Sequence, residues 1–396
     1  MLYARSILMM ARFSELEKKA ADLISRAIDS GETPCANMMI IRKDELICYA
    51  QAGKDPGTGR EISRDTIFRL YSQTKPVTSA AVCLLLERGI LDMNEPVNTY
   101  LPGFEEQKVL GKMGELMAAD RPVKLMDLMG MTAGLAYPGD DPAGHYAAKL
   151  FEDNQRAMDE GKPGLTTVEM ANEIGKLPLA FQPGSDFRYS TCADVLGAVV
   201  EVASGKSFSR FLREEFFEPL GMKDTGFSLP EEKLSRLITC AHRSPEGIQA
   251  MECRHLNVGN YSREPAFASG GAGLVSTLDD YRQFASMLLH KGTWKGVRIL
   301  SPATVDWMTQ SQESLENRWG GLEGYRYGKL MRVCQDAGQV PGLAIPGEYG
   351  WDGWLGTYFS NFPSLNLTLL LNMNVADTGT GSLTRRIRNL MLASLG

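Results

Sequence analysis

The spacing of apolar and polar residues at the start of the chain predicts a helix followed by two strands. Residues 14–29 carry apolar side chains at helical intervals, which is typical of an amphipathic helix. Residues 37–50 are mostly apolar on either side of Lys43-Asp44, a pattern that indicates two strands joined by a turn. The N-terminal part of the chain is therefore expected to alternate between helix and sheet.

The C-terminal part repeats these elements in the opposite order. Residues 347–362 and 365–375 are predicted as strands, and residues 381–395 as a closing helix. Strands near both termini, with helices outside them, predict one sheet built from the two chain ends. The middle of the chain, about residues 94–252, is richer in helical spacing and loops, which indicates an α-helical lobe facing the sheet. We expect residues 1–93 and 253–396 to form an α/β domain together and residues 94–252 to form the helical lobe. A functional site is expected in the cleft between the domain and the lobe.

The run of residues 77–89 predicts a helix that is apolar on nearly every side and therefore buried between layers. Ser72 and Lys75 lie three residues apart where this helix should begin, so they share one face of it. Lys75 is the only lysine of the chain with a serine three residues before it. A hydroxyl and an amine one turn apart have the geometry of a serine nucleophile with a lysine base, although such a pair is also common on solvated helix faces.

Burial of the helix changes the expected chemistry of Lys75. Desolvation disfavours the ammonium and lowers the pKa, and neutrality near pH 7 requires a shift of about three units, or ~4 kcal/mol. The positive end of the helix dipole would favour a developing alkoxide on Ser72. Pro76 is tolerated in the first turn, and Gly89 is expected to end the helix.

Composition narrows the classes of function. The chain of 396 residues has 43% hydrophobic residues and a formal net charge of −6, as expected of an ordinary globular protein. The negative charge and the lack of a basic run argue against nucleic acid as a partner. No apolar stretch reaches the ~20 residues that a membrane-spanning helix needs, so no membrane association is expected.

The cysteines and the N-terminus indicate a cytoplasmic location. Seven scattered cysteines, an odd number, do not form a disulfide or zinc framework. The first twelve residues resemble a signal peptide only faintly, because the apolar part is short and no small-residue cleavage site follows it. A reducing compartment is the natural expectation.

Two further segments carry candidate chemistry. Tyr189 follows the turn 182–188 and precedes a helix expected from about Cys192, so it could relay protons at the mouth of a cleft, or simply pack. The segment 350–357 contains three glycines, which would let a substrate approach closely and leave an amide free for an oxyanion. The alternative for this segment is a bulged edge strand with its tryptophans in the core.

Other catalytic templates fit poorly. No serine has glycine at both −2 and +2, so the nucleophile elbow of α/β-hydrolases is absent. The four histidines show neither metal-ligand spacing nor a Ser/His/Asp order, and His290 is expected to cap the helix that precedes it. The glycine-rich segments lack the strand and helix context of nucleotide sites.

Together, these segments resemble the β-lactamase and penicillin-binding-protein superfamily of serine hydrolases, and within it the class C-like carboxylesterase branch (family VIII). The resemblance covers the chain from about residue 15 to the end. It is carried by Ser72-Gln73-Thr74-Lys75, Tyr189-Ser190-Thr191 with Asp194-Val195-Leu196-Gly197, and Trp351-Asp352-Gly353, and is supported by residues 218–225 and 270–277.

The resemblance implies a fold and a set of roles. The implied fold is α+β, an antiparallel β-sheet flanked by helices from both chain ends with an inserted α-helical lobe. Ser72 would be the acyl-accepting nucleophile, and Lys75 and Tyr189 would share the general-base and proton-relay work. The backbone N–H groups of Ser72 and Trp354 would form the oxyanion hole. The third motif, Trp351-Asp352-Gly353, would contact the substrate.

Two departures from the family pattern bear on the substrate. Thr191 stands where the β-lactamases and peptidases carry an asparagine, and Trp351 stands where they carry lysine or histidine. The asparagine binds a substrate amide and the cation anchors a substrate carboxylate, so losing both leaves polar groups unpaired at ~1–3 kcal/mol each. An uncharged ester needs neither contact, and both departures are familiar in the esterase branch.

We therefore expect a serine carboxylesterase that acts on small or moderate esters through an acyl-enzyme, with no metal or organic cofactor. The partner would be a small-molecule ester, and the oligomeric state is left open. Four aromatic residues and three methionines could line an apolar acyl pocket or belong to the core: Trp351, Trp354, Tyr358, Phe359, Met126, Met129 and Met131. The alternatives are an acyltransferase, a β-lactamase or D-Ala-D-Ala peptidase, and a non-catalytic scaffold.

Overall fold

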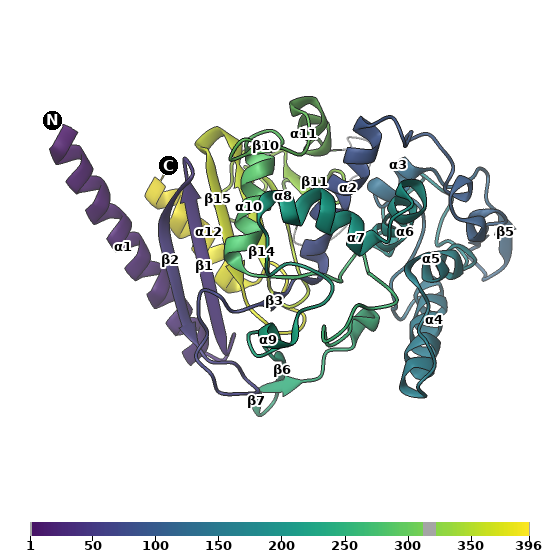
Figure 1. The fold of residues 1–396 in the computed structure, drawn as a ribbon, viewed down its shortest axis with the longest axis horizontal. Coiled ribbons are helices and arrows are strands. Elements are labelled where there is room, and N and C mark those ends of the chain that lie inside the picture. The colour runs from purple at the N-terminus through teal and green to yellow at the C-terminus, as the bar shows by residue number, and fades with distance from the viewer. Residues whose placement is uncertain (1, 312–321, 396) are drawn as a thin grey trace.

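The computed structural model describes residues 2–311 and 322–395. Its centre is a seven-stranded antiparallel sheet in the order β11-β12-β13-β14-β15-β1-β2. The strands are β1 (Cys35–Arg42), β2 (Glu45–Gly53), β11 (Tyr325–Tyr327), β12 (Arg332–Cys334), β13 (Tyr349–Asp352), β14 (Tyr358–Phe362) and β15 (Leu367–Asn372). The last strand, β15, pairs with β1, so the two chain ends form one sheet as predicted (Figure 1).

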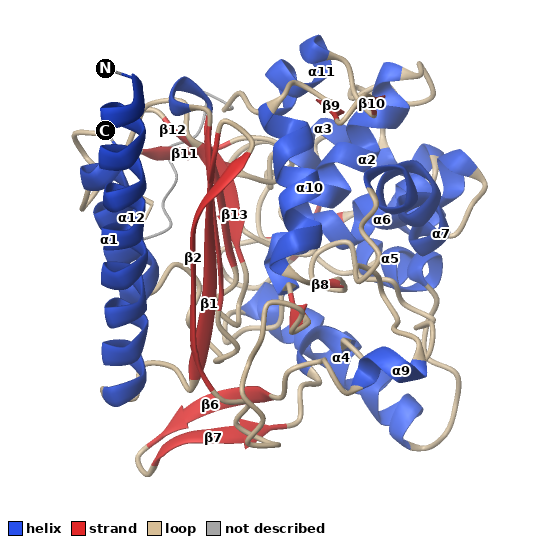
Figure 2. Ribbon diagram, turned by 60° about the vertical axis from the view of Figure 1, so that its left-hand side comes forward, coloured by secondary structure: helices blue, strands red, loops and turns tan. Residues whose placement is uncertain are grey.

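Helices cover both faces of this sheet. The terminal helices α1 (Leu2–Asp29) and α12 (Ser382–Leu395) pack against each other on one face, and α10 (Leu278–Leu289) and α2 (Lys75–Glu87) lie on the other (Figure 2). Successive side chains of a strand point to opposite faces, and both faces are buried here. In β1, Met38 contributes to the core under α1 and α12, whereas Met39 contributes to the core under α2. This two-sided burial explains why the sequences of the central strands β1 and β15 are apolar along most of their length.

The inserted lobe is mainly helical, as the sequence predicts. Its helices, and those that follow it, are α3 (Leu125–Met129), α4 (Pro142–Asp159), α5 (Thr167–Gly175), α6 (Cys192–Ser204), α7 (Phe208–Leu212), α8 (Glu218–Leu220), α9 (Glu231–Leu234) and α11 (Pro302–Met308). Two short hairpins lie in the lobe, β4 (Lys108–Leu110) with β5 (Leu116–Ala118) and β6 (Cys240–Ser244) with β7 (Gly247–Met251). Two more short pairs lie outside it, β3 (Phe68–Arg69) with β8 (Val275–Ser276) and β9 (Thr293–Trp294) with β10 (Val297–Arg298). Helices α2 and α6 pack together, which joins the lobe to the sheet domain.

Two sequence-based boundaries need correction. The first helix begins at Leu2 rather than near residue 14. The long strand predicted over 347–362 is two strands, β13 and β14, because Gly353 and Gly356 close a tight turn between them and Gly356 has φ +90°. The buried helix begins at Lys75, as expected, after a 3₁₀ turn at Tyr71–Thr74, and Gly89 follows its end in the left-handed conformation (φ +68°).

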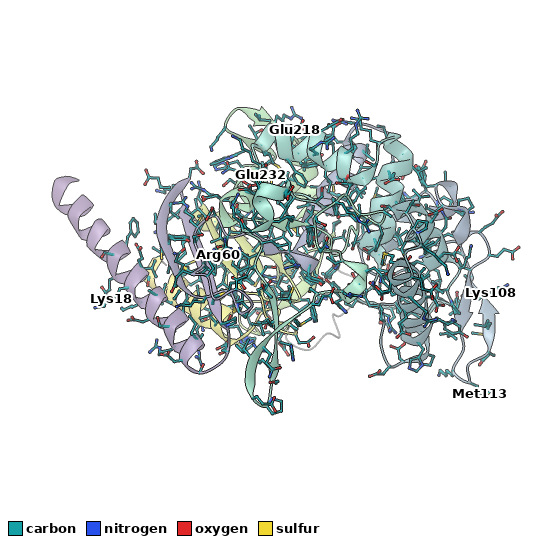
Figure 3. All side chains as sticks on the ribbon, turned by 60° about the horizontal axis from the view of Figure 1, so that its bottom comes forward. Lys18, Arg60, Lys108, Met113, Glu218 and Glu232 are labelled. Carbon is teal, nitrogen blue, oxygen red and sulfur yellow. The ribbon has the colours of Figure 1, made fainter. Side chains whose placement is uncertain are left out.

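Charged side chains lie on the outer surface of both lobes, among them Lys18, Lys108, Glu218 and Glu232 (Figure 3). The tip of the β4–β5 hairpin carries Met113, which is 92% exposed. Within the described ranges 2–311 and 322–395, no helix combines the length and the apolar character needed to cross a membrane.

Candidate active site

The turn that carries Ser72 is held in an unusual conformation. Tyr71 precedes Ser72 with φ +45°, in the left-handed region that bulky residues rarely adopt, at a cost of roughly 1–3 kcal/mol. The Tyr71 hydroxyl lies 2.9 Å from Cys253 Sγ, and its ring packs edge-on against Trp354 at 5.0 Å between centroids. These contacts hold the turn in place and present Ser72 in the 3₁₀ turn that leads directly into α2.

Ser72 and Lys75 meet as the spacing predicts. Lys75 Nζ lies 2.9 Å from Ser72 Oγ and donates a second hydrogen bond of 2.9 Å to the carbonyl oxygen of Gly271. The hydroxyl is part of a cavity wall, while the amine is fully buried behind it. The pair is therefore placed for proton transfer from the hydroxyl to the amine.

The environment of Lys75 favours the neutral amine. Burial lowers its pKa to about 7, and the negative charge of Asp194 opposes this shift. Asp194 is itself buried and accepts hydrogen bonds from Ser269 Oγ (2.5 Å) and the Gly271 amide (3.0 Å) through one carboxylate oxygen. Burial raises the pKa of Asp194, and these hydrogen bonds oppose that shift. Lys75 thus titrates near neutrality, as predicted from the apolar helix.

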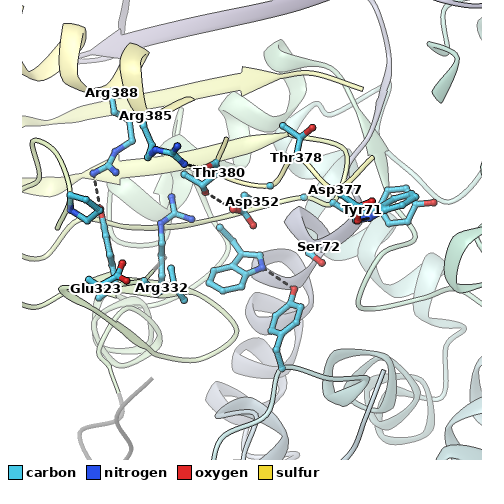
Figure 4. A pocket seen from close by; sticks show the side chains of 18 of the residues that line it. Tyr71, Ser72, Glu323, Arg332, Asp352, Asp377, Thr378, Thr380, Arg385 and Arg388 are labelled. Atoms are coloured by element: carbon cyan, nitrogen blue, oxygen red, sulfur yellow. Dashed lines mark hydrogen bonds between the residues drawn. The ribbon is translucent and has the colours of Figure 1, made fainter. Parts of the chain in front are cut away.

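Tyr189 joins this pair from the helical lobe. It lies at the end of the loop before α6, as expected, and its hydroxyl accepts a 3.0 Å hydrogen bond from the indole N–H of Trp351 (Figure 4). Burial raises the pKa of Tyr189, while hydrogen bonds to Ser72 and Trp351 lower it. The ring lies 4.6 Å from Lys75 Nζ, so the phenol and the amine both lie beside Ser72.

A cavity of about 910 Å³ opens at Ser72. Of the residues predicted for the site, six line its wall: Ser72, Tyr189, Trp351, Asp352, Gly353 and Trp354. Thr191 lies behind the wall instead, fully buried, with its hydroxyl 3.4 Å from the carbonyl oxygen of Ala136. Lys75 reaches the site only through its amine.

The neighbouring protein atoms leave room only for a glycine at position 353. A Cβ atom at this position would lie 2.1 Å from the carbonyl oxygen of Leu70 and 2.3 Å from Thr357 Oγ1. The close approach expected at this glycine is therefore made by the protein backbone. It brings the turn after β13, which carries Trp354, against the segment that leads into Ser72.

Of the seven residues suggested for an apolar acyl pocket or for the core, only the two tryptophans line the cavity. Trp351 and Trp354 line the cavity, and the indole N–H of Trp354 is bonded to Asp377 at 2.7 Å. The other candidates, Tyr358, Phe359, Met126, Met129 and Met131, belong to the hydrophobic packing. β13 is also an interior strand of the sheet, so the edge-strand alternative is wrong.

Several cavity residues were missed by sequence reasoning. Tyr137 is half-buried, with its ring 5.3 Å from Lys75 Nζ, and His255 packs against Trp354 with 4.4 Å between ring centroids. Burial lowers the pKa of His255, which favours the neutral ring. Arg332, Arg385 and Arg388 also line the cavity. None of them belongs to a local motif, because each is brought to the wall by tertiary packing.

The site also lacks the features of a metal centre. No group of three or more His, Cys, Asp or Glu within the described ranges is placed to hold a metal ion. All seven cysteines are buried and free.

The arrangement of these elements agrees with a family profile that covers nearly the whole chain. The profile is that of the Beta-lactamase family, and it matches residues 20–392. This chain belongs to the Beta-lactamase family. The membership accounts for Ser72, Lys75 and Tyr189 meeting at one point although Tyr189 comes from a separate lobe.

Similar proteins from this family span the same length. Protein Rv1367c of Mycobacterium tuberculosis is 31% identical over 362 residues, covering 88% of this chain and 87% of the relative. Esterase EstB of Burkholderia gladioli is 29% identical over 371 residues, covering 90% of each. The structure of EstCE1, described as a hydrolase with promiscuous acyltransferase activity, superposes with a TM-score of 0.78 at 25% identity, covering 97% of this chain and 99% of EstCE1.

Proposed function

We propose that this Beta-lactamase family protein is a serine carboxylesterase that hydrolyses small or moderate esters through an acyl-enzyme on Ser72. The observation that carries the proposal is the 2.9 Å contact between Ser72 Oγ and a buried Lys75 amine whose pKa is about 7, at the wall of a cavity. The esterase activity named for EstB and the hydrolase activity named for EstCE1 support it.

The residues divide the work as follows. The neutral Lys75 amine accepts the Ser72 proton while Ser72 Oγ attacks the ester carbonyl carbon, which gives a tetrahedral oxyanion. The backbone N–H groups of Ser72 and Trp354, held together by the Gly353–Leu70 approach, stabilise that oxyanion. Tyr189 conveys the proton to the departing alkoxide, which leaves as an alcohol. Water then attacks the acyl-enzyme by the reverse sequence of proton transfers and releases the acid.

The third motif favours esters over lactams. Trp351 stands where a lysine or histidine anchors a carboxylate in lactam-cleaving members, and its indole N–H is used by Tyr189. An indole offers no charge to a carboxylate beside the β-lactam bond, whereas a simple ester bond needs none.

The test is hydrolysis of p-nitrophenyl acetate, butyrate and octanoate beside the lactam nitrocefin, for the wild type and Ser72→Ala. We expect ester turnover that is lost in Ser72→Ala, with little cleavage of nitrocefin. Faster turnover of nitrocefin than of the esters would overturn the ester assignment. Ester turnover that survives in Ser72→Ala would remove Ser72 as the nucleophile.

A second candidate is acyl transfer to an alcohol or amine, because the first half-reaction is the same. The acyltransferase activity named for EstCE1 supports this second candidate. Adding butanol to the p-nitrophenyl butyrate assay separates the two. A transferase produces butyl butyrate in preference to butyrate, and a hydrolase produces mainly the acid.

We also propose a cellular location and a partner for the protein. We propose a cytoplasmic location, which the seven free, buried cysteines support. The proposed partner is a small-molecule ester, and the proposed chemistry uses only groups of the protein.

A further inference from the structure

A second cavity, of about 1010 Å³, shares a wall with the catalytic cavity. The shared wall is the segment after β7, in which His255 and Leu256 line the catalytic cavity whereas Cys253 lines the second one. Cys240, at the start of β6, lines the second cavity too, and the exposed Lys162 lies at its rim (Figure 1 shows the β6–β7 hairpin). A small molecule can therefore approach two thiols that are only 1% and 8% exposed.

The β6–β7 hairpin brings these two thiols together. Cys240 pairs with Met251 across the hairpin, and Cys253 follows two residues later, which places it on the same face. The Cys240 thiol donates a hydrogen bond to the sulfur of Cys253. The two sulfur atoms are thus in contact, with no other side chain between them.

Three groups stabilise a thiolate at Cys253. The hydrogen bond from Cys240 is the strongest of them, the Tyr71 hydroxyl lies 2.9 Å from Cys253 Sγ, and the Arg69 guanidinium lines the same cavity. Together they lower the pKa of Cys253, although burial acts in the opposite direction. Burial raises the pKa of the five cysteines outside this pair. Because oxidants and electrophiles react with the thiolate, Cys253 is chemically distinct from those five.

Tyr71 connects Cys253 to the catalytic turn. This tyrosine precedes Ser72 and has φ +45°, and its side chain is 1% exposed (Figure 4). Its hydroxyl lies 2.9 Å from Cys253 Sγ and 3.5 Å from the carbonyl oxygen of His255. A chemical change at the Cys253 sulfur therefore alters a contact that holds the residue beside the nucleophile in a strained conformation.

We propose that Cys253 is a site of oxidation by hydroperoxides, that Cys240 closes a disulfide with it, and that this modification acts on Ser72 through Tyr71. The modification goes beyond the proposed esterase function, and its thiol chemistry does not depend on that function. In a reducing compartment both thiols stay free until peroxide is present.

The chemistry balances with hydrogen peroxide as the oxidant. The Cys253 thiolate attacks one peroxide oxygen, the O–O bond breaks, and hydroxide leaves and takes up a proton to become water. The product is a sulfenic acid. The Cys240 sulfur then attacks the oxidised sulfur, an S–S bond forms, the S–O bond breaks, and the hydroxyl leaves as water with the Cys240 proton. The two thiols lose two electrons in total, and the peroxide gains them.

Peptide mapping tests this without any need for turnover. Trypsin separates the two cysteines because it cuts after Arg236, Arg243 and Arg254. Native protein treated with a small excess of hydrogen peroxide, quenched with acid and alkylated, should yield peptides 237–243 and 244–254 joined by a disulfide that dithiothreitol splits. The linked peptides should form about tenfold or more faster than any oxidation of the five other cysteines. Absence of the linked peptides, or equal oxidation of all cysteines, would overturn the proposal.

Variants assign the role of each thiol. In Cys240→Ala, oxidation is slower without the hydrogen bond and should stop at the sulfenic acid, which dimedone labels at Cys253. Cys253→Ser should leave Cys240 unoxidised, and dimedone labelling of Cys240 in this variant would overturn the assignment. Cys48→Ala is the matched control, because Cys48 is also buried and its sulfur contacts Met38 Sδ. It should leave the yield of the linked peptides unchanged.

The effect on the catalytic turn is measured as the ratio of kcat for p-nitrophenyl butyrate before and after oxidation. In the wild type kcat should fall about three- to tenfold, as expected for the loss of one hydrogen bond, and dithiothreitol should restore it. Tyr71→Phe has no hydroxyl to lose, so oxidation should leave its kcat unchanged. Linked wild-type protein with unchanged kcat would overturn the connection through Tyr71. If no ester is hydrolysed but the linked peptides form, the esterase function is wrong and the oxidation site stands. If esters are hydrolysed but no linked peptides form, the oxidation site is wrong and the esterase function stands.

Discussion

Replacing Asp194 by asparagine should move the pH dependence of the enzyme to lower pH. The carboxylate raises the pKa of Lys75, against the larger lowering effect of burial. Both hydrogen bonds that Asp194 accepts, from Ser269 and from the Gly271 amide, end on Oδ1. An asparagine keeps that oxygen, so Asp194→Asn removes the charge while it preserves these contacts.

The size of the change in the Lys75 pKa follows from the distance between the two charges. The backbone of Gly271 connects the two groups, because Lys75 Nζ donates to its carbonyl oxygen and its amide donates to Asp194 Oδ1. The charges are then separated by roughly 6–8 Å, and with an effective dielectric constant near 20 they interact by about 2–3 kcal/mol. That energy corresponds to a pKa change of about 1.5–2 units.

The assay is kcat/KM for p-nitrophenyl butyrate from about pH 5 to about pH 9. The base must be neutral, so activity should rise as the pH increases through the Lys75 pKa, about 7 in the wild type. Without the negative charge the ammonium is less stable, its pKa falls, and the rising limb moves to lower pH. A limb that stays in place or moves to higher pH would refute the reasoning.

Asp280→Asn is the matched control for this experiment. Asp280 is also a buried aspartate, 8% exposed, and burial raises its pKa to about 6. It accepts hydrogen bonds from the Asp224 amide and Thr225 Oγ1 at the start of α10. Its replacement should leave the rising limb of the profile where it is.

Three further changes test other parts of the site. Tyr189→Phe should lower kcat by about 10²–10⁴ in the ester assay with unchanged circular dichroism, and near-wild-type activity would remove the phenol from the mechanism. Lys75→Met should inactivate the protein yet raise its free energy of unfolding, measured in urea. At and below pH 7 the lowered pKa of Lys75 destabilises the folded protein by about 5 kcal/mol, and this cost disappears above about pH 10.5. Because the variant also loses two hydrogen bonds, the expected net gain at pH 7 is ~2–3 kcal/mol. No gain in stability would mean that the amine is well solvated. Gly353→Ala should lower stability by about 2 kcal/mol or more and reduce kcat, since its Cβ would overlap the Leu70 carbonyl, whereas Gly259→Ala, in open space, should change neither.

The parts of the site that the sequence predicted depend on short-range geometry. Ser72 and Lys75 are three residues apart, so helix periodicity alone brings them together. The apolar run after them was enough to predict a neutral lysine. Tyr189 was placed correctly at a loop before a helix, but its meeting with Ser72 could be expected only from the resemblance to a family.

The parts that were missed depend on long-range register. Arg332 and Arg388 reach the cavity through the pairing of β12 with β13 and the packing of α12, neither of which leaves a local pattern in the sequence. The turn at Gly353 was missed for a related reason. Its glycine is required by Leu70, a residue that is distant in the sequence.

The pairing of β1 with β15 has a consequence for how the protein is made. Asn37 pairs with Asn372, so the sheet cannot close until almost the whole chain has left the ribosome. Until then the β1–β2 hairpin exposes an apolar strand edge, together with two faces that become buried only later. Such non-local pairing slows folding and gives nascent chains time to associate. Expression should therefore be most sensitive to truncation or delayed synthesis at the C-terminus, and co-expressed chaperones should improve the yield of active protein.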